Sequence, residues 1–499
     1  TKIRPKMKAK PMREHIRKLE AEARLLDPPA AQRDKWLDTA GDYARHFLED
    51  LPAKATYVRD PGVNGFARSA IQDKATDLDE LLGFFGREVD TTGILPCSGG
   101  QMGYIPGGGL FPSAIGDFLA DVSNRYSGVA FAGPGAARME GALLRWMAEL
   151  VGYPETAAGD LTSGGSTATL AALVAARDAH GIGPDRVRQS CVYLTAQAHH
   201  CVGKALHVAG LSEVRRRVVG MDGRFRMDAG QLERMIEEDR SQGFNPWLVI
   251  GSVGTTDTGA VDPIVAIADL ASRYGLWFHA DAAYGGFFLL CPEGREAIHD
   301  MQRADSIVMD PHKGLGIPYG TGAVLVRDGT LLARSNAYYA DYMQDAKRLE
   351  PDPETPYSPA DYSLELTRPF RGPRLWFPLK LFGLRPFRAM LSEKIWLARH
   401  FHEALSRRPG FETGPPPDLS IVTFRYRPRS GDPDAFNRAL LEAVHEDGRI
   451  FITSTRVDGR FTLRLAALNF RTHLEHVDYL LDLLTDKAAE LEAPPSEVK

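Results

Sequence analysis

A lysine and an aspartate follow two apolar, strand-like runs, and together they could carry out imine chemistry. Lys313 ends the motif Asp-Pro-His-Lys after the run 306–309, and Asp281 follows the run 276–280. Ligands collect at the carboxyl ends of the strands in open α/β sheets, so both side chains are expected at one edge. Burial lowers the pKa of an amine, which would make Lys313 a nucleophile toward an aldehyde. Asp281 could hold a protonated ring nitrogen and so turn a bound heteroaromatic ring into an electron sink. Either residue alone would more often be a solvated loop residue or a helix cap.

A segment of small residues, 162–167, could bind an anion. Its sequence Thr-Ser-Gly-Gly-Ser-Thr leads into an alanine-rich stretch, 168–179, that is expected to be helical. The free amides and the dipole at the start of a helix favour a phosphate group, although the same sequence also suits an ordinary capped helix start. The segment lacks the Gly-Lys-Ser/Thr of a P-loop and the GxGxxG of a dinucleotide site.

A histidine follows the run 191–194, on the same predicted edge of the sheet. There His199 could stack on a flat ring, and His200 beside it leaves the choice between the two histidines open.

Short apolar runs alternate with helical patterns from about residue 151, which predicts a mostly parallel sheet covered by helices on both faces. Residues 36–51 place apolar groups on one face of an early helix that Pro52 ends. A strand over 461–468 and a helix around 477–484 are expected near the end of the chain. Segment 334–363 shows no period and reads as a long loop, either a functional lid or disorder. The runs that read as strands of the sheet are 191–194, 247–250, 276–280, 306–309 and 323–326.

The bulk composition is ordinary for a soluble globular protein: 499 residues, 43% apolar, with a net charge of −5. This charge gives no electrostatic basis for binding nucleic acid or an anionic membrane. The 4 cysteines show no CxxC spacing, so we expect no disulfide framework, no metal site and a cytoplasmic setting. No apolar run approaches the roughly 20 residues of a membrane span.

Together these segments resemble the group II pyridoxal-phosphate-dependent amino-acid decarboxylases, a family of fold type I that includes the aromatic-L-amino-acid decarboxylases. The resemblance covers about residues 36–485. It implies an α/β fold with a large domain over 111–378, built on the mostly parallel sheet, and a small C-terminal α+β domain over 379–499. It also implies an N-terminal helical segment, 1–110, that wraps the partner subunit of a homodimer. The most specific motifs are Ala198-His199, Gly254-Thr-Thr256, Asp281-Ala-Ala-Tyr284, Pro311-His-Lys313 and Leu463-Arg-Leu-Ala-Ala-Leu-Asn-Phe470.

By this resemblance, Lys313 would carry pyridoxal 5'-phosphate as a Schiff base and Asp281 would pair with the pyridine nitrogen. His199 would stack on the ring face opposite Ala283, and Tyr342 would return a proton to the substrate after carbon dioxide leaves. The other residues that the resemblance places near the cofactor are Gly165, Ser166, Thr256 and His312. Those that it places near the substrate are Tyr104, Ile105 and Arg368.

The chain also departs from the family's usual pattern. Asp310 stands where asparagine is common, and Ile105 and Gly107 stand where an aromatic residue and threonine are common. Gly314 stands where tryptophan often follows the lysine. These departures concern the substrate wall and leave decarboxylation itself unaffected. Decarboxylation of an aromatic L-amino acid to its amine is the leading prediction, with a non-aromatic amino acid as the alternative.

Other activities remain open on the sequence alone. An aldehyde synthase would use oxygen on the same substrate, and a tyrosine at position 342 argues against it. A fold-type-I desulfurase would need a cysteine on the loop 334–363, which contains none. A non-catalytic nucleotide-binding module built on the Gly164-Gly165 turn is a third hypothesis.

Overall fold

A computed structural model describes residues 9–62, 64–337 and 358–493. The chain divides into two compact units, 1–95 and 96–499. The predicted divisions at residues 110 and 378 stay predictions. No helix among the described residues is long and apolar enough to cross a membrane.

The first unit is mainly helical, with α1 (Ala9–Ala23), α2 (Ala30–Asp50) and α3 (Leu78–Glu88). Helix α2 confirms the predicted early helix, and Pro52 lies in the short 3-10 turn that follows it. Strands β1 (Tyr57–Val58) and β2 (Gly93–Ile94) pair antiparallel. Apolar side chains on one stripe of α1, such as Met12, Ile16 and Leu19, are exposed.

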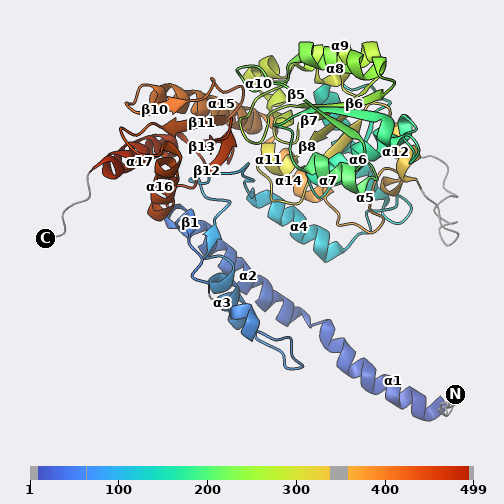
Figure 1. Cartoon of the computed structure of the whole chain (residues 1–499). Coiled ribbons are helices and arrows are strands. Elements are labelled where there is room, and N and C mark those ends of the chain that lie inside the picture. Colours follow the sequence, from blue (N-terminus) through green and yellow to red (C-terminus); the bar gives the residue numbers. More distant parts are fainter. Residues whose placement is uncertain (1–8, 63, 338–357, 494–499) are drawn as a thin grey trace, which may run out of the picture. The chain divides into compact units, whose positions relative to one another are not determined.

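The second unit is built on a sheet of 7 strands in the order β3-β9-β8-β7-β6-β4-β5 (Figure 1). Strand β9 runs in the opposite direction to the other six strands, and all pairs that do not include β9 are parallel. The mostly parallel sheet that the sequence predicted is therefore confirmed. The strands are β3 (Ala158–Thr162), β4 (Ser190–Thr195), β5 (Arg215–Val219), β6 (Asn245–Ser252), β7 (Trp277–Asp281), β8 (Ser306–Met309) and β9 (Gly322–Val326).

Helices cover both faces of this sheet because its strands are apolar on both sides. Phe278 and Ile307 pack into one core with α5 (Pro134–Val151), α8 (Ala229–Ser241) and α9 (Ile264–Tyr274). Their neighbours Trp277 and Val308 pack into the opposite core with α6 (Gly165–Ala179), α7 (Cys201–Val208) and α12 (Gly329–Asn336). Figure 1 shows α8 and α9 on one side of the sheet and α6 and α7 on the other. Burial of each such aromatic or aliphatic side chain contributes roughly 1.5–3 kcal/mol, which stabilises the sheet between the two helical layers.

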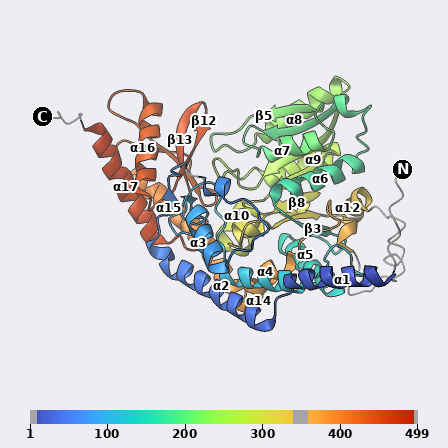
Figure 2. The ribbon, with the colours of Figure 1, turned by 90° about the horizontal axis from the view of Figure 1, so that it is seen from below.

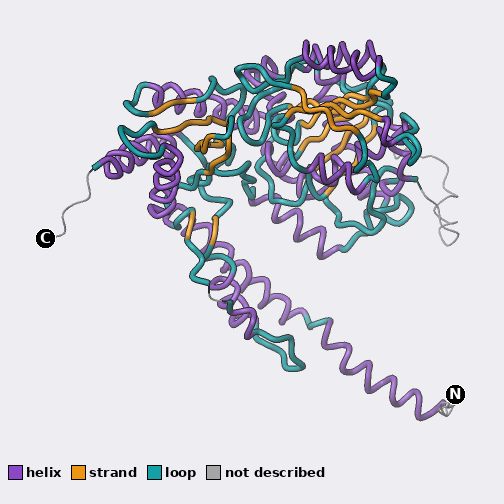
Figure 3. Tube along the Cα trace, in the orientation of Figure 1, coloured by secondary structure: helices purple, strands orange, loops and turns teal. Residues whose placement is uncertain are grey.

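A second, antiparallel sheet forms the C-terminal part, in the order β10-β11-β13-β12. It packs against three helices in a core of its own, apart from the first sheet (Figures 2 and 3). The predicted strand and final helix near the C-terminus are both present. The elements are β10 (Phe411–Thr413), β11 (Ile421–Tyr426), β12 (Thr453–Val457), β13 (Arg460–Ala466), α15 (Leu384–Ser406), α16 (Pro433–Asp447) and α17 (Leu474–Glu492).

The remaining connections differ in part from the sequence expectation. The long loop was expected from residue 334, but residues 334–336 form the last turn of α12. Residues 338–357 lie outside the described part, and the chain resumes with a 3-10 turn, Pro359–Asp361. The other helices that matter for the site are α4 (Phe111–Ser123), α11 (Pro311–Gly314) and α14 (Gly372–Phe382).

Candidate active site

A cavity of about 380 Å³ lies where β4, β6, β7 and β8 end and α6 begins. Loops from distant parts of the sequence meet here because parallel strands end at the same edge of a sheet. The structure thus brings together most of the side chains that the sequence singled out. Those that line the cavity are His199, Asp281, Lys313, Gly165, Ser166, Thr256, Ala283 and His312.

Lys313 lies on the short helix α11, directly after β8, with its side chain 21% exposed. Its Nζ is 3.0 Å from Asp310 Oδ2. Burial, the largest influence, lowers the pKa of Lys313, but the charge and hydrogen bond of Asp310 and the charge of Asp281 together raise it above its usual value. The sequence expectation of a lowered pKa was therefore wrong, because it considered desolvation without the carboxylate three residues earlier.

Asp281 and His199 both line the cavity. Asp281 ends β7, and its Oδ1 accepts a hydrogen bond of 3.3 Å from the backbone amide of Ala283. The half-buried His199 ring accepts a 3.3 Å bond at Nδ1 from the amide of Cys201, the first residue of α7. Burial lowers the pKa of His199, although Asp281 opposes this shift, so the ring is neutral near pH 7. His200 is exposed and does not line the cavity.

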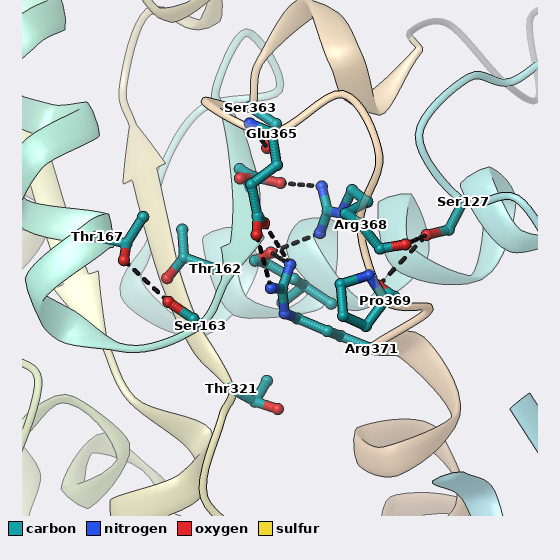
Figure 4. Close-up of polar contacts among 12 residues, drawn as sticks. Ser127, Thr162, Ser163, Thr167, Thr321, Ser363, Glu365, Arg368, Pro369 and Arg371 are labelled. Atoms are coloured by element: carbon teal, nitrogen blue, oxygen red, sulfur yellow. Dashed lines mark hydrogen bonds and ion pairs between the residues drawn. The ribbon is translucent and has the colours of Figure 1, made fainter. Parts of the chain in front are cut away.

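The start of α6 forms the other end of the cavity. A Cβ added to Gly165 would lie 2.9 Å from Asp310 Oδ2 and 3.2 Å from Ala283 Cβ, so only glycine leaves this space open. The first amides of a helix have no partner within it, and its dipole favours an anion there. The hydroxyls of Ser163 and Thr167 hydrogen bond to each other at 2.9 Å beside these amides (Figure 4).

His312 closes the cavity beside the lysine. Its Nδ1 donates to the carbonyl oxygen of Thr321 at 2.6 Å, and burial lowers its pKa, so Nε2 carries no proton at neutral pH. Two buried oxygens on the cavity wall, Gln197 Oε1 and Asp310 Oδ1, have no hydrogen-bond partner among the described residues. A bound polar molecule would satisfy such groups, since buried polar atoms are normally paired.

Arg368 is not among the described residues that line the cavity, contrary to a direct role in substrate binding. Its guanidinium is fully buried and pairs with Asp160 of β3 and Glu140 of α5. Figure 4 shows it beside Arg371, which pairs with Glu365 at 2.7 Å. The charge of Arg368 is thus balanced by two buried carboxylates within the protein. This geometry does not favour a contact between Arg368 and the substrate, and that contact stays a prediction.

Tyr104 and Ile105, the other predicted substrate residues, are also not among the described residues that line the cavity. Tyr104 is 60% exposed, with its ring centre 5.9 Å from that of Phe451. Ile105 packs against the core on the first sheet. Tyr342 lies outside the described residues, so its predicted role remains a prediction.

Sequence reasoning missed several residues at the site. Cys201 lines the cavity, and burial raises the pKa of its thiol to about 12, which keeps it protonated. Arg464 of β13 donates to the carbonyl oxygen of Thr256 at 2.6 Å and to Thr453 Oγ1 at 2.8 Å. It thereby ties the cavity loop to the second sheet. A charged residue inside the apolar strand 461–468 was the available signal for Arg464.

Comparisons with known proteins agree with this geometry. Residues 69–427 match the conserved domain of pyridoxal-dependent decarboxylases. The chain is 32% identical over 445 residues to the aromatic-L-amino-acid decarboxylase of Bacillus atrophaeus, covering 88% of this chain and 91% of that protein. It is 29% identical over 396 residues to a phenylacetaldehyde synthase of Arabidopsis thaliana, covering 76% of this chain and 80% of that protein.

A solved structure shares the fold over nearly the whole length. The crystal structure of Oryza sativa TDC with PLP and tryptamine superposes with a TM-score of 0.87 at 26% identity, covering 94% of this chain and 99% of that one. The family match spans more than half of the 499 residues, and the relatives are matched over most of their own length. This chain therefore belongs to the family of pyridoxal-dependent decarboxylases and is a carboxy-lyase that uses pyridoxal 5'-phosphate.

Proposed function

We propose that this chain converts an aromatic L-amino acid into the corresponding amine and carbon dioxide. The observation that carries the proposal is that Lys313, Asp281 and His199 line one cavity with the start of α6. In the reaction the bond from Cα to the carboxyl carbon breaks, carbon dioxide leaves, and a proton takes its place on Cα. The name of the 32% identical relative from Bacillus atrophaeus supports the aromatic class of substrate.

The residues at the cavity fit pyridoxal 5'-phosphate. Lys313 would hold the aldehyde carbon, Asp281 the ring nitrogen, and the amides of Gly165 and Ser166 the phosphate. Bound there, the cofactor supplies a sink for the electron pair that remains on the substrate when carbon dioxide leaves. The space kept open at Gly165 and the unpartnered oxygens of Gln197 and Asp310 support this fit.

The protein's own groups then set the protonation and orientation of the reactants. The carboxylate of Asp281 favours a charged ring nitrogen, because an opposite charge nearby stabilises the protonated form. The neutral imidazole of His199 can lie against the ring face without adding a second cation. We propose Tyr342 as the donor of the proton to Cα, as the resemblance implies.

Two of the departures from the family pattern are explained by packing. A Cβ on Gly314 would lie 2.7 Å from Phe287 Cβ, so a tryptophan after Lys313 could not fit without moving Phe287. A Cβ on Gly107 would lie 2.9 Å from both the His312 carbonyl oxygen and the Tyr319 ring. Both glycines are explained by close packing against neighbouring residues of this chain. They are therefore no argument against an aromatic substrate.

We also propose that the chain works as a homodimer in the cytoplasm. Helix α4 presents five large apolar side chains to solvent, which is unusual for a 13-residue helix of a monomer. We expect Phe118→Asp to yield monomers in light scattering after size exclusion, while a dimer that persists would place the interface elsewhere. The apolar residues exposed on α4 are Phe111, Ile115, Phe118, Leu119 and Val122.

The substrate proposal is tested by screening the twenty amino acids for release of carbon dioxide from the holoenzyme. We expect an aromatic amino acid to react fastest and to yield one amine per carbon dioxide. Lys313→Ala serves as the inactive control. Preference for a non-aromatic acid would refute the substrate class. Aldehyde, ammonia and peroxide in place of amine would identify an aldehyde synthase, the activity of the 29% identical relative.

A further inference from the structure

Asp310 is a second carboxylate in the cavity, beside the lysine and the anion-binding start of α6. It is 1% exposed, and its Oδ2 lies 3.0 Å from Lys313 Nζ. Glycines on two other elements make room for it: a Cβ on Gly165 would lie 2.9 Å from Oδ2, and one on Gly322 would lie 2.6 Å from Oδ1. The protein therefore holds a buried anion against the site proposed for the phosphate group.

We propose that Asp310 takes up one proton when pyridoxal 5'-phosphate binds, so that cofactor binding is coupled to proton uptake. Without the cofactor, the Asp310 carboxylate pairs with the Lys313 ammonium at 3.0 Å. The inference rests on the proposed roles of Lys313 and the start of α6 in holding this cofactor.

Binding changes the surroundings of Asp310 in two ways. The lysine nitrogen forms a double bond to the aldehyde carbon, and the aldehyde oxygen leaves as water with two hydrogens from Nζ. The nitrogen then keeps at most one of its three hydrogens, which weakens the pair with Asp310. The phosphate brings a second anion to the amides of α6, beside Asp310 Oδ2. Two anions this close in a buried site cannot both stay fully ionised, so one proton from solvent goes to the carboxylate.

No other group facing Asp310 supplies a replacement cation. His312 Nε2 lies 3.7 Å from Asp310 Oδ2, and burial lowers the pKa of His312, so its ring is neutral and adds no positive charge beside the carboxyl. The other charged or titratable groups that act on this pair come from β7, the loop before α7, α7 itself and α14; they are Asp281, His199, Cys201 and Arg374.

Each of these four leaves the expectation unchanged. Asp281 adds negative charge, His199 and Cys201 are uncharged at neutral pH, and Arg374 is held by Asp117 at 2.8 Å. The carboxyl of Asp310 is therefore the group whose charge must change.

The test is calorimetric titration of the cofactor-free protein with pyridoxal 5'-phosphate at pH 8. Buffers of different ionisation enthalpy give the number of protons exchanged, which requires no catalytic turnover. Asp310→Asn keeps the shape and removes the charge. Asp305→Asn is the matched control, because Asp305 precedes the same strand β8 at its opposite end and does not line the cavity. Pyridoxal, which lacks the phosphate, is the second ligand.

For the wild type and for Asp305→Asn we expect proton uptake to exceed that of Asp310→Asn by about one per site. The apparent Kd should then weaken about tenfold more per pH unit in the wild type than in Asp310→Asn. Pyridoxal should show a smaller difference between the proteins, because it brings no second anion. The ³¹P NMR shift of the bound cofactor reports the phosphate's own charge: a dianion in both the wild type and Asp310→Asn assigns the extra proton to Asp310, whereas a monoanion in the wild type alone would overturn the assignment.

Equal proton uptake by the wild type and Asp310→Asn would overturn the inference. The proposed function would still stand if borohydride fixed the cofactor to Lys313 in the same samples. A protein that neither binds the cofactor nor is labelled at Lys313 would instead contradict the proposed function itself.

Discussion

Replacement of Arg368 by methionine tests whether this arginine is a structural residue or a substrate ligand. In the structure its guanidinium pairs with Glu140 and Asp160, both also buried. Burial raises the pKa of Glu140 to about 7, and Arg368 is the first influence that opposes this rise. Burial likewise raises the pKa of Asp160, again opposed by Arg368. Methionine fills a similar volume but leaves two carboxylates buried without their cation.

The expected loss of stability follows from that arrangement. Removing one partner of a buried ion pair costs about 3–5 kcal/mol. With an unfolding entropy of roughly 2.1 cal/mol/K per residue over a unit of about 400 residues, this lowers the thermal midpoint by about 4–6 °C. The loss should depend on pH. A carboxyl whose pKa is higher in the folded state binds its proton there more tightly, so stability falls as pH rises through that pKa. The deficit of Arg368→Met should therefore be larger at pH 8 than at pH 6.

The assay is a thermal melt of the wild type, Arg368→Met and the double variant Glu140→Gln/Arg368→Met at both pH values. The double variant should recover part of the midpoint at pH 8, because one of the two stranded carboxylates is gone. Arg303→Met is the surface control: Arg303 pairs with the half-exposed Asp269, and its loss should cost less than about 1 kcal/mol. An Arg368→Met protein with an unchanged melt but a raised KM would refute the structural reasoning and restore the substrate contact.

Three further outcomes are expected. Gly165→Ala should weaken binding of pyridoxal 5'-phosphate at least tenfold in a fluorescence titration, because the new methyl group would lie 2.9 Å from Asp310 Oδ2; unchanged affinity would move the phosphate away from α6. Asp281→Asn should lower kcat by about 100-fold or more, because the amide cannot hold the ring nitrogen charged. Borohydride should still fix the cofactor to Lys313 in this variant. A kcat near that of the wild type would show that Asp281 does not have this role. Tyr342→Phe should slow amine formation and shift product toward aldehyde, measured as amine per carbon dioxide released; an unaltered ratio and rate would exclude Tyr342 as the proton donor.

The sequence predicted the strands of the first sheet that are mainly apolar, and it missed two strands that carry charged residues. Runs such as 247–250 and 323–326 are apolar throughout because helices cover both sides. Strand β5, with the sequence Arg-Arg-Arg-Val-Val, was missed because it lies at the edge of the sheet and keeps its arginines largely solvated. Strand β3 was missed because it contains Gly159, which approaches the backbone of Val324, and Asp160, whose charge meets Arg368.

At the candidate site, the positions of residues at strand ends could be predicted from the sequence, whereas their ion-pair partners far away in the chain could not. Asp281 and Lys313 were predicted to meet because each follows a strand of a parallel sheet, and this needs no knowledge of partners. The partners of Arg368 could not be predicted, since Asp160 lies 208 residues earlier in the chain and no pattern links the two. A resemblance transfers residue positions, but it does not transfer the charges that surround them in this particular chain.

Lys313 shows why the surrounding charges decide the chemistry. The amine must lose a proton before it can attack an aldehyde, and the ion pair with Asp310 holds that proton by raising the pKa of Lys313. Burial acts in the opposite direction and is the larger single influence. If Asp310 takes up a proton from solvent when the phosphate arrives, the strongest charge that opposes burial disappears, and the pKa of the amine falls at the moment the aldehyde is present. The lysine would then be a stable, charged residue in the empty cavity and a nucleophile only when the cofactor enters.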